Sequence, residues 1–283
     1  MASGKPRLCA ENIFDTVRNP THELTASSFV VGNEPWRVGS ARREARNHWK
    51  PTSDNADAWL EADCQVVKTC DFFALYAEHN LAGYQVKLQA SSDDFTTWTD
   101  VLDFTVPSYT VPGSRLNVAP YARTWDGCLV ARFQPQTARY WRLFVPAMGA
   151  SLRPQVVGLH VGQSVQFTNG AVFPFSDARV ELAYDEILSP ALWAAATRKA
   201  QRRTSGGVPL AIPLELGEAD LVERHLSGIF WRGSVMWIVT NDRRAERSVL
   251  AYAPRGDHGV VQSSEDPQGL LLVDWREHQP KEV

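Results

Sequence analysis

The sequence predicts a mainly β protein, with an N-terminal jelly-roll β-sandwich followed by a β-rich C-terminal domain that contains one or two short helices. Three observations predict this fold. Apolar or alternating runs of strand length, rich in Val, Phe, Tyr and Trp, recur along the chain. Turn-forming clusters such as 91–94 and 111–114 separate these runs. No long helical period interrupts the first part of the chain, as is typical of sandwiches and jelly rolls.

The strands expected in the first domain are runs of apolar or alternating residues with turn-forming residues between them. They are 28–31, 59–63, 71–76, 84–90, 128–133, 139–145 and 156–161. After Gly162 the pattern changes, and the chain of 283 residues is long enough for two hydrophobic cores. We therefore expect a jelly roll over 1–162 and a β-rich docking or assembly domain over 163–283.

The second domain is expected to begin with a helix. Ser189 is a favourable N-cap, Pro190 suits the first helical position, and basic residues up to Arg203 complement the helix dipole before the stop at Gly206. A shorter helix is expected over 218–226. The strands expected in this domain are 208–214, 229–232, 235–241, 248–253 and 269–275.

Composition excludes several classes of protein. With 29 basic and 32 acidic residues the formal net charge is −3, which argues against a general nucleic-acid-binding protein. No apolar run is long enough for a membrane span, and the first residues lack the apolar core of a secretory signal. The cysteines are interpreted as free thiols of a protein made in a reducing cytoplasm; they are Cys9, Cys64, Cys70 and Cys128.

Catalytic motifs are not found. The sequence has no P-loop, no dinucleotide-binding glycine motif, no nucleophile elbow and no zinc-protease motif, and its 7 His are scattered. The acidic pairs Asp93 with Asp94 and Asp54 with Asp57 could serve a hydrolase, but their context favours turn residues. The chain is therefore expected not to be an enzyme and to hold no cofactor or metal; a polysaccharide hydrolase is the least favoured alternative.

The 10 Trp of the sequence include several near basic residues, which suggests a contact surface. Aromatic and basic side chains can stack on sugar rings or bury against a partner chain. Equally, Trp49 could belong to the core, and the arginines could be solvated or form a subunit interface. The candidates for contact with a carbohydrate or a partner are Trp36, Arg37, Arg42, Arg43, Arg46, His48, Trp49 and Trp125.

Four segments resemble the discoidin family of galactose-binding-like jelly rolls. They are the Trp59–Asp63 strand, the segment from Tyr84 to Trp98 with its Ser-Asp turn, the Ala-Arg-Tyr-Trp-Arg-Leu run at 138–143, and the closing strand at 156–162. The resemblance implies that Trp59, Trp98 and Trp141 supply the core of the jelly roll, and that Arg139 and Asp63 tie strand ends together. The sequence departs from the family at Asp94-Phe95, where glycine is usual in the turn.

A narrower resemblance concerns tail proteins of long-tailed bacteriophages, and it rests on Ala74 to Leu81, the turn before Trp98, and Tyr140 to Leu143. It implies a structural component of a tail tip or baseplate, made in the host cytoplasm and located in the virion tail. The expected partners are other tail or baseplate proteins and further copies of the chain in an oligomer or ring. The alternative is a carbohydrate-binding module that recognises a host surface glycan during adsorption.

Overall fold

The computed structural model is mainly β, as the sequence predicts, and its sheets are antiparallel. It describes residues 7–9, 11–39, 48–76, 79–93, 95–107, 121–123, 128–168, 181–187, 197–203, 207–213, 235–239, 249–252, 258–263 and 266–277. Within these ranges a single short 3-10 helix, η1 (Pro35–Gly39), accompanies the strands.

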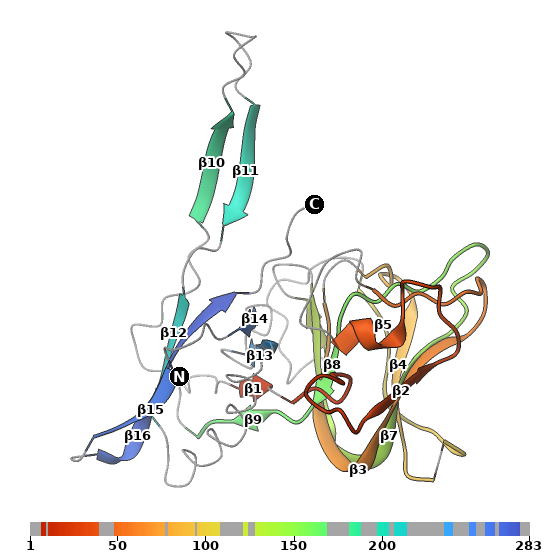
Figure 1. Cartoon of the computed structure of the whole chain (residues 1–283), viewed down its shortest axis with the longest axis horizontal. Coiled ribbons are helices and arrows are strands. Elements are labelled where there is room, and N and C mark those ends of the chain that lie inside the picture. The colour runs from red at the N-terminus through yellow and green to blue at the C-terminus, as the bar shows by residue number, and fades with distance from the viewer. Residues whose placement is uncertain are drawn as a thin grey trace.

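One seven-stranded sheet forms the jelly-roll part (Figure 1). Its strands are β2 (Glu23–Ala26), β3 (Ala58–Leu75), β4 (Gln85–Ser91), β5 (Thr99–Thr105), β6 (Tyr121–Arg123), β7 (Leu129–Val145) and β8 (Leu159–Gly162). The order is β2-β3-β7-β4-β5, with β6 added to β7 and β8 added to β3. Strands β3 and β7 are therefore the central pair.

The central pair bends sharply, and the bend turns one sheet into two layers. The first half of β3 pairs with the end of β7, from Ala58 opposite Val145 onwards, while its last residue, Leu75, pairs with Leu129. Register shifts interrupt the pairing between Asp63 and Lys68 and again after Cys70. Such bulges bend strands and increase their twist. Because both strands fold back in the same place, their four ends lie at one end of the sandwich, away from the bend (Figure 1).

The core fills the space between the two layers. Inward-facing residues alternate along each strand, so Leu60 and Ala62 of β3 are buried between residues that face outward. Trp141 is the largest side chain that β7 places in this core. Phe73 and Leu75 approach from the other layer, and burying each such side chain contributes about 1.5–3 kcal/mol.

A second seven-stranded sheet combines the C-terminal strands with the start of the chain. Its order is β12-β16-β14-β13-β1-β9, with β15 added to β16. The bounds are β1 (Arg7–Cys9), β9 (Val165–Gln166), β12 (Gly207–Pro213), β13 (Val235–Val239), β14 (Val249–Tyr252), β15 (His258–Ser263) and β16 (Asp266–Glu277). Since β1 lies between β9 and β13, the division at 162, which stays a prediction, does not separate the strands of the two sheets cleanly.

A buried polar network joins β1 to β3. The carboxylate of Asp71 accepts hydrogen bonds from the backbone N–H of Ser164 at 2.6 Å and from its hydroxyl at 2.8 Å. The guanidinium of Arg7 lies 3.7 Å from Asp71 and donates to the Ser164 hydroxyl at 3.0 Å. Both charged side chains are about nine-tenths buried, with 8% and 10% exposure. The pair therefore links the two sheets across the protein interior.

Most predicted strands are confirmed, although several are longer than the sequence pattern indicated. The segments 59–63 and 71–76 are parts of β3, and 128–133 and 139–145 are parts of β7. The strands predicted at 84–90, 208–214, 235–241, 248–253 and 269–275 correspond to β4, β12, β13, β14 and β16, and β8 covers the end of 156–161.

Two predicted elements are wrong. Residues 28–31 form a loop rather than a strand, because Val30 and Asn33 turn back through hydrogen bonds from Val30 N to Lys50 O and from Asn33 N to Val30 O. The end of the predicted helix is β11 (Thr197–Arg203), which pairs along its length with β10 (Glu181–Ile187). Cross-strand pairing overrides helix propensity there. Ser189, Pro190, the helix predicted at 218–226 and the strand at 229–232 lie outside the described residues.

The network at Asp71 gives a testable expectation for stability. Asp71→Ala removes the carboxylate and leaves the Arg7 guanidinium and the Ser164 N–H buried without it, so we expect a loss of about 3 kcal/mol. Urea unfolding measures this. The matched control is Asp103→Ala, which breaks an exposed pair with Lys87 and should cost about 1 kcal/mol or less. Equal losses in both variants would contradict the structural role of the network.

Candidate functional site

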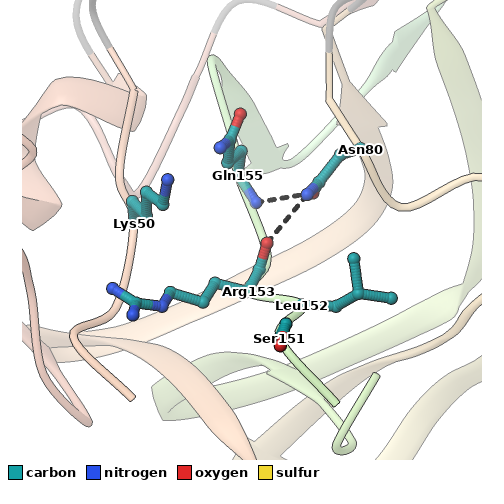
Figure 2. A pocket seen from close by; sticks show the side chains of 6 residues that line it. All are labelled: Lys50, Asn80, Ser151, Leu152, Arg153 and Gln155. Carbon is teal, nitrogen blue, oxygen red and sulfur yellow. Dashed lines mark hydrogen bonds between the residues drawn. The ribbon is translucent and has the colours of Figure 1, made fainter. Parts of the chain in front are cut away.

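A polar pocket opens at the end of the sandwich where the ends of β3 and β7 meet. Its volume is about 370 Å³ (Figure 2). The lining residues come from three loops, before β3, after β3 and after β7; they are Lys50, Asn80, Ser151, Leu152, Arg153 and Gln155. The bend of the central strands is thus what brings these distant loops together.

Asn80 fixes one wall of the pocket (Figure 2). Its side-chain Nδ2 donates to the carbonyl of Arg153 at 2.8 Å, and its Oδ1 accepts from the backbone N–H of Gln155 at 2.7 Å. The backbone N–H of Asn80 also donates to the carbonyl of Gln155 at 3.4 Å. An irregular loop usually lacks regular backbone partners; here one amide side chain supplies them and sets the positions of Arg153 and Gln155.

Trp49 fixes the opposite wall from inside the protein. Its side chain is 0% exposed, and its indole Nε1 donates to the carbonyl of Ser28 at 3.1 Å. Its backbone exchanges two hydrogen bonds with Val156, at 3.0 and 3.1 Å. This bridge holds Lys50, the next residue, beside the segment that carries Arg153.

The lining is polar and unbalanced in charge. It contains two cations, two amides and one hydroxyl, and no carboxylate. Such groups donate hydrogen bonds readily, whereas the amide and hydroxyl oxygens can also accept them. A pocket of this composition suits a ligand rich in hydroxyl or negatively charged oxygen atoms.

An exposed apolar loop is attached to the same end of the sandwich. Lys50 accepts a hydrogen bond from Val30 N at 2.8 Å, and Asn33 Nδ2 donates to the carbonyl of His48 at 3.1 Å. The loop and η1 expose Phe29 at 45%, Val31 at 90% and Trp36 at 49%. Large apolar groups gathered on one exposed loop are a feature of contact surfaces.

The helix η1 holds Trp36 in place. Val38 is buried, and Gly39 approaches the backbone of Phe14 so closely that a Cβ would lie 1.8 Å from the Phe14 carbonyl oxygen. Arg37 lies with its guanidinium 5.0 Å from the centre of the Trp36 ring and pairs with Glu34 at 2.6 Å. The hydrogen bond from Arg37 lowers the pKa of Glu34.

The structure separates the contact residues expected from the sequence. Trp36 and Arg37 lie at the surface on η1, and His48 is half-buried beside the loop. Trp49 is a core residue, because its ring fills the space beneath the loops rather than facing solvent. The remaining candidates lie outside the described residues; they are Arg42, Arg43, Arg46 and Trp125.

The three tryptophans expected in the jelly-roll core also differ. Trp141 is wholly buried and donates its indole N–H to the Ala138 carbonyl at 3.2 Å. Trp59 is half-buried on the outer face of the sheet, because the alternation along β3 turns its neighbours inward. Trp98 is half-buried too, and the guanidinium of Arg142 lies 4.1 Å from the centre of its ring. The prediction that all three tryptophans lie in the core of the jelly roll is therefore wrong for Trp59 and Trp98.

The expected tie between strand ends is confirmed. Arg139 on β7 donates two hydrogen bonds to the carboxylate of Asp63 on β3, at 2.7 and 2.8 Å. This bidentate contact lowers the pKa of Asp63. It lies beside the first bulge and fixes the register there.

The acidic residues proposed as hydrolase pairs act in turns where the structure describes them. Asp93 accepts hydrogen bonds from the Ser91 hydroxyl and from the backbone N–H of Thr97, at 2.7 and 2.9 Å, and its bonds to Thr97 and Ser91 lower its pKa to about 2. Asp57 accepts from the backbone N–H of Ala147 at 3.0 Å. Asp94 lies outside the described residues. No cluster of three metal-ligating side chains occurs in the part of the chain that the structure describes.

The cysteines are free thiols, as predicted, and all four are buried. Burial raises the pKa of Cys64 to about 12 and raises that of Cys9 and Cys70 as well. Thiolates are the reactive form, so these residues are structural in character.

Sequence reasoning did not single out the pocket-lining residues. Asn80 stands within the segment 74–81 that carries the resemblance to tail proteins, but nothing there marks its amide as a loop-fixing group. Lys50, Arg153 and Gln155 belong to no motif. Their significance depends on three loops meeting, and only the bend in β3 and β7 determines that meeting.

No protein-family model matches the sequence, and the search of curated proteins gives no match. Similar solved structures include carbohydrate-binding modules. Chitosan-binding module 1 of a chitosanase/glucanase from Paenibacillus sp. IK-5 is 19% identical, with 53% of this chain and 98% of that chain covered and a TM-score of 0.40. CpGH89CBM32-5 from Clostridium perfringens, in complex with GalNAc-β-1,3-galactose, is 12% identical, with 51% and 97% covered and a TM-score of 0.39.

A third structure is the family 32 module of C. perfringens NanJ in complex with galactose, which is 11% identical, with 56% of this chain and 99% of that chain covered and a TM-score of 0.39. No comparison indicates a phage tail protein, and the tail-tip role stays a prediction. Among the residues that the structure describes, no helix has the length and the apolar character needed to span a membrane.

The turn before Trp98 supports a prediction about stability. Phe95 belongs to the Asp94-Phe95 pair at which the sequence departs from the resemblance to discoidin domains, and its φ is 64°, a left-handed conformation that costs a non-glycine residue about 1–2 kcal/mol. Its ring packs 4.3 Å from Tyr140, centre to centre, which offsets part of this cost. We expect Phe95→Ala, which keeps the backbone cost and loses the ring, to be about 1 kcal/mol less stable than Phe95→Gly. Thermal unfolding of the two variants decides, and a less stable glycine variant would contradict the account.

Proposed function

We propose that the chain binds glycans through the pocket and the exposed loop beside it. The observation that supports this most directly is the polar pocket of about 370 Å³ whose amides and cations are held by backbone contacts at the end of a β-sandwich. Pockets of this size class accommodate small ligands, with a few fixed polar groups for orientation.

The amides are arranged to recognise hydroxyl groups. Asn80 uses one N–H and one lone pair for the loop, which leaves the other N–H and the other lone pair for a ligand. Gln155 has its backbone N–H fixed by Asn80, so its side chain extends from a defined position (Figure 2). The Ser151 hydroxyl adds a group that both donates and accepts. Sugar hydroxyls require this mixture of donors and acceptors.

The exposed loop supplies the apolar part of the contact. A sugar ring has C–H faces as well as hydroxyls, and a flat aromatic side chain covers such a face well. Phe29 is nearly half exposed on the loop that is hydrogen-bonded to Lys50, and Trp36 is nearly half exposed on η1, which follows that loop. The polar pocket and the aromatic loop together provide the two kinds of contact that a glycan needs.

A glycan array with the full chain, followed by calorimetry on the best ligand, tests this function. We expect Gln155→Ala and Trp36→Ala each to weaken binding about tenfold, since each removes contacts worth roughly 1.4 kcal/mol. Gln136→Ala, at the exposed bend on the far side from the pocket, is the matched control and should bind normally. Binding to no glycan at millimolar concentration would overturn the function, and full binding by both variants would overturn the site.

The structural role in a phage tail tip or baseplate, an oligomer or ring there, and a location in the virion remain proposals from the sequence resemblance. Glycan binding at one end of the sandwich is compatible with such a role. Mass spectrometry of purified particles tests it, and a particle that lacks the chain would contradict it.

A further inference from the structure

We propose that the pocket selects acidic sugars, with the carboxylate of a hexuronate unit held between Lys50 and Arg153. The inference rests on the proposed glycan binding and specifies its ligand. It starts from the charge of the pocket, which is opposite to the net charge of −3 of the whole chain.

Among the described residues, Lys50 and Arg153 have no carboxylate partner. Within the described ranges, neither side chain lies within ion-pair distance of an Asp or Glu, and neither is hydrogen-bonded to one. Six other described cations each have a carboxylate partner; they are Arg7, Arg37, Lys68, Lys87, Arg139 and Arg142. The same pocket is therefore lined by two cations that have no carboxylate partner among the described residues.

The aspartates of the loop before β3 do not line the pocket. The loop before β3 carries Asp54 and Asp57, and it contacts the pocket segment through a hydrogen bond from Asn55 N to the Leu152 carbonyl at 3.2 Å. Asp57 is engaged by the backbone N–H of Ala147, and neither aspartate lines the pocket. The lining thus keeps its two positive charges facing a space bordered by neutral amides.

The local structure fixes where these charges stand. Arg153 is positioned by the bond from Asn80 to its carbonyl, and Lys50 follows the buried Trp49 and its backbone bridge to Val156. Figure 2 shows Lys50 on the side of the pocket opposite Asn80, and the Arg153 side chain extending from its backbone toward that same side. Because the backbone at Lys50 and Arg153 is already held in place, less entropy is lost when the two side chains bind a ligand.

The chemistry of the two cations suits a carboxylate. A guanidinium presents parallel N–H donors that match the two oxygens of a carboxylate, and an ammonium adds a compact charge. The amides of Asn80 and Gln155 would then face the ring hydroxyls of the same unit. Chitosan, which carries ammonium groups, would be repelled by this pocket, so it serves as the ligand of opposite charge.

Calorimetry of the full chain with oligosaccharides of equal length tests the inference, using oligogalacturonate, a neutral galactose oligomer, a sulfated galactose oligomer and chitosan. We expect oligogalacturonate to bind about tenfold more tightly than the neutral oligomer at low salt, with most of this preference lost at about 0.5 M NaCl. Arg153→Gln and Lys50→Gln should each remove most of the preference, measured in each variant as the ratio of its affinities for oligogalacturonate and for the neutral oligomer. Lys87→Gln is the control, because it removes the same charge from the outer face of the sheet.

The outcomes separate the two proposals. Equal affinity for acidic and neutral oligomers overturns the charge selection and leaves glycan binding in place. Tighter binding of the sulfated oligomer or of chitosan than of oligogalacturonate also overturns it. A preference that survives in both pocket variants, with circular dichroism showing normal folding, overturns the assignment to Lys50 and Arg153. No binding of any oligomer overturns the glycan-binding function itself.

Discussion

The bulged bend shared by β3 and β7 is the constraint on which the jelly-roll part depends. Each strand contributes one half to each layer, so the same pair of strands lines both sides of the core. The bidentate contact between Arg139 and Asp63 sets the register at the point where the pairing is interrupted. A shift of one residue in this pairing would turn Leu60 and Trp141 toward solvent. It would also turn the polar side chains between the core residues into the interior.

The bend also determines where a ligand can bind. It places the loops at both ends of β3 and the loop after β7 at one end of the molecule, and these loops have little regular structure of their own. Asn80 and Trp49 hold these loops in place. Asn80 does so with side-chain hydrogen bonds, and Trp49 with a buried ring and a backbone bridge to Val156. Rigid support beneath a variable surface is how many β proteins present binding residues.

The sequence was most informative where a pattern depends on local chemistry. Alternation predicts β4, β12 and β14, and the Ser-Asp turn before Trp98 is recognisable although Asp94-Phe95 stand where the resemblance implies glycine. It was least informative where distant segments decide the outcome. Residues 197–203 have good helix-ending chemistry, yet they pair with 181–187. Trp49 and Trp36 look alike in sequence, but a core contact buries the first and η1 exposes the second, and no local signal distinguishes them.

The position of β1 has a consequence for the order in which the chain folds during synthesis. The sandwich strands β2 to β8 all precede residue 163, so their pairing can begin while the later part of the chain is still on the ribosome. Strand β1, although made before the other described strands, has one partner in β9 and the other in β13, at Val235–Val239. One edge of β1 therefore waits for most of the protein to be translated, and Arg7, bound to Ser164 and Asp71, can hold the strand in place until then. Strand β1 thus precedes the other described strands in the chain, yet its hydrogen bonds are completed only after β13 has been made.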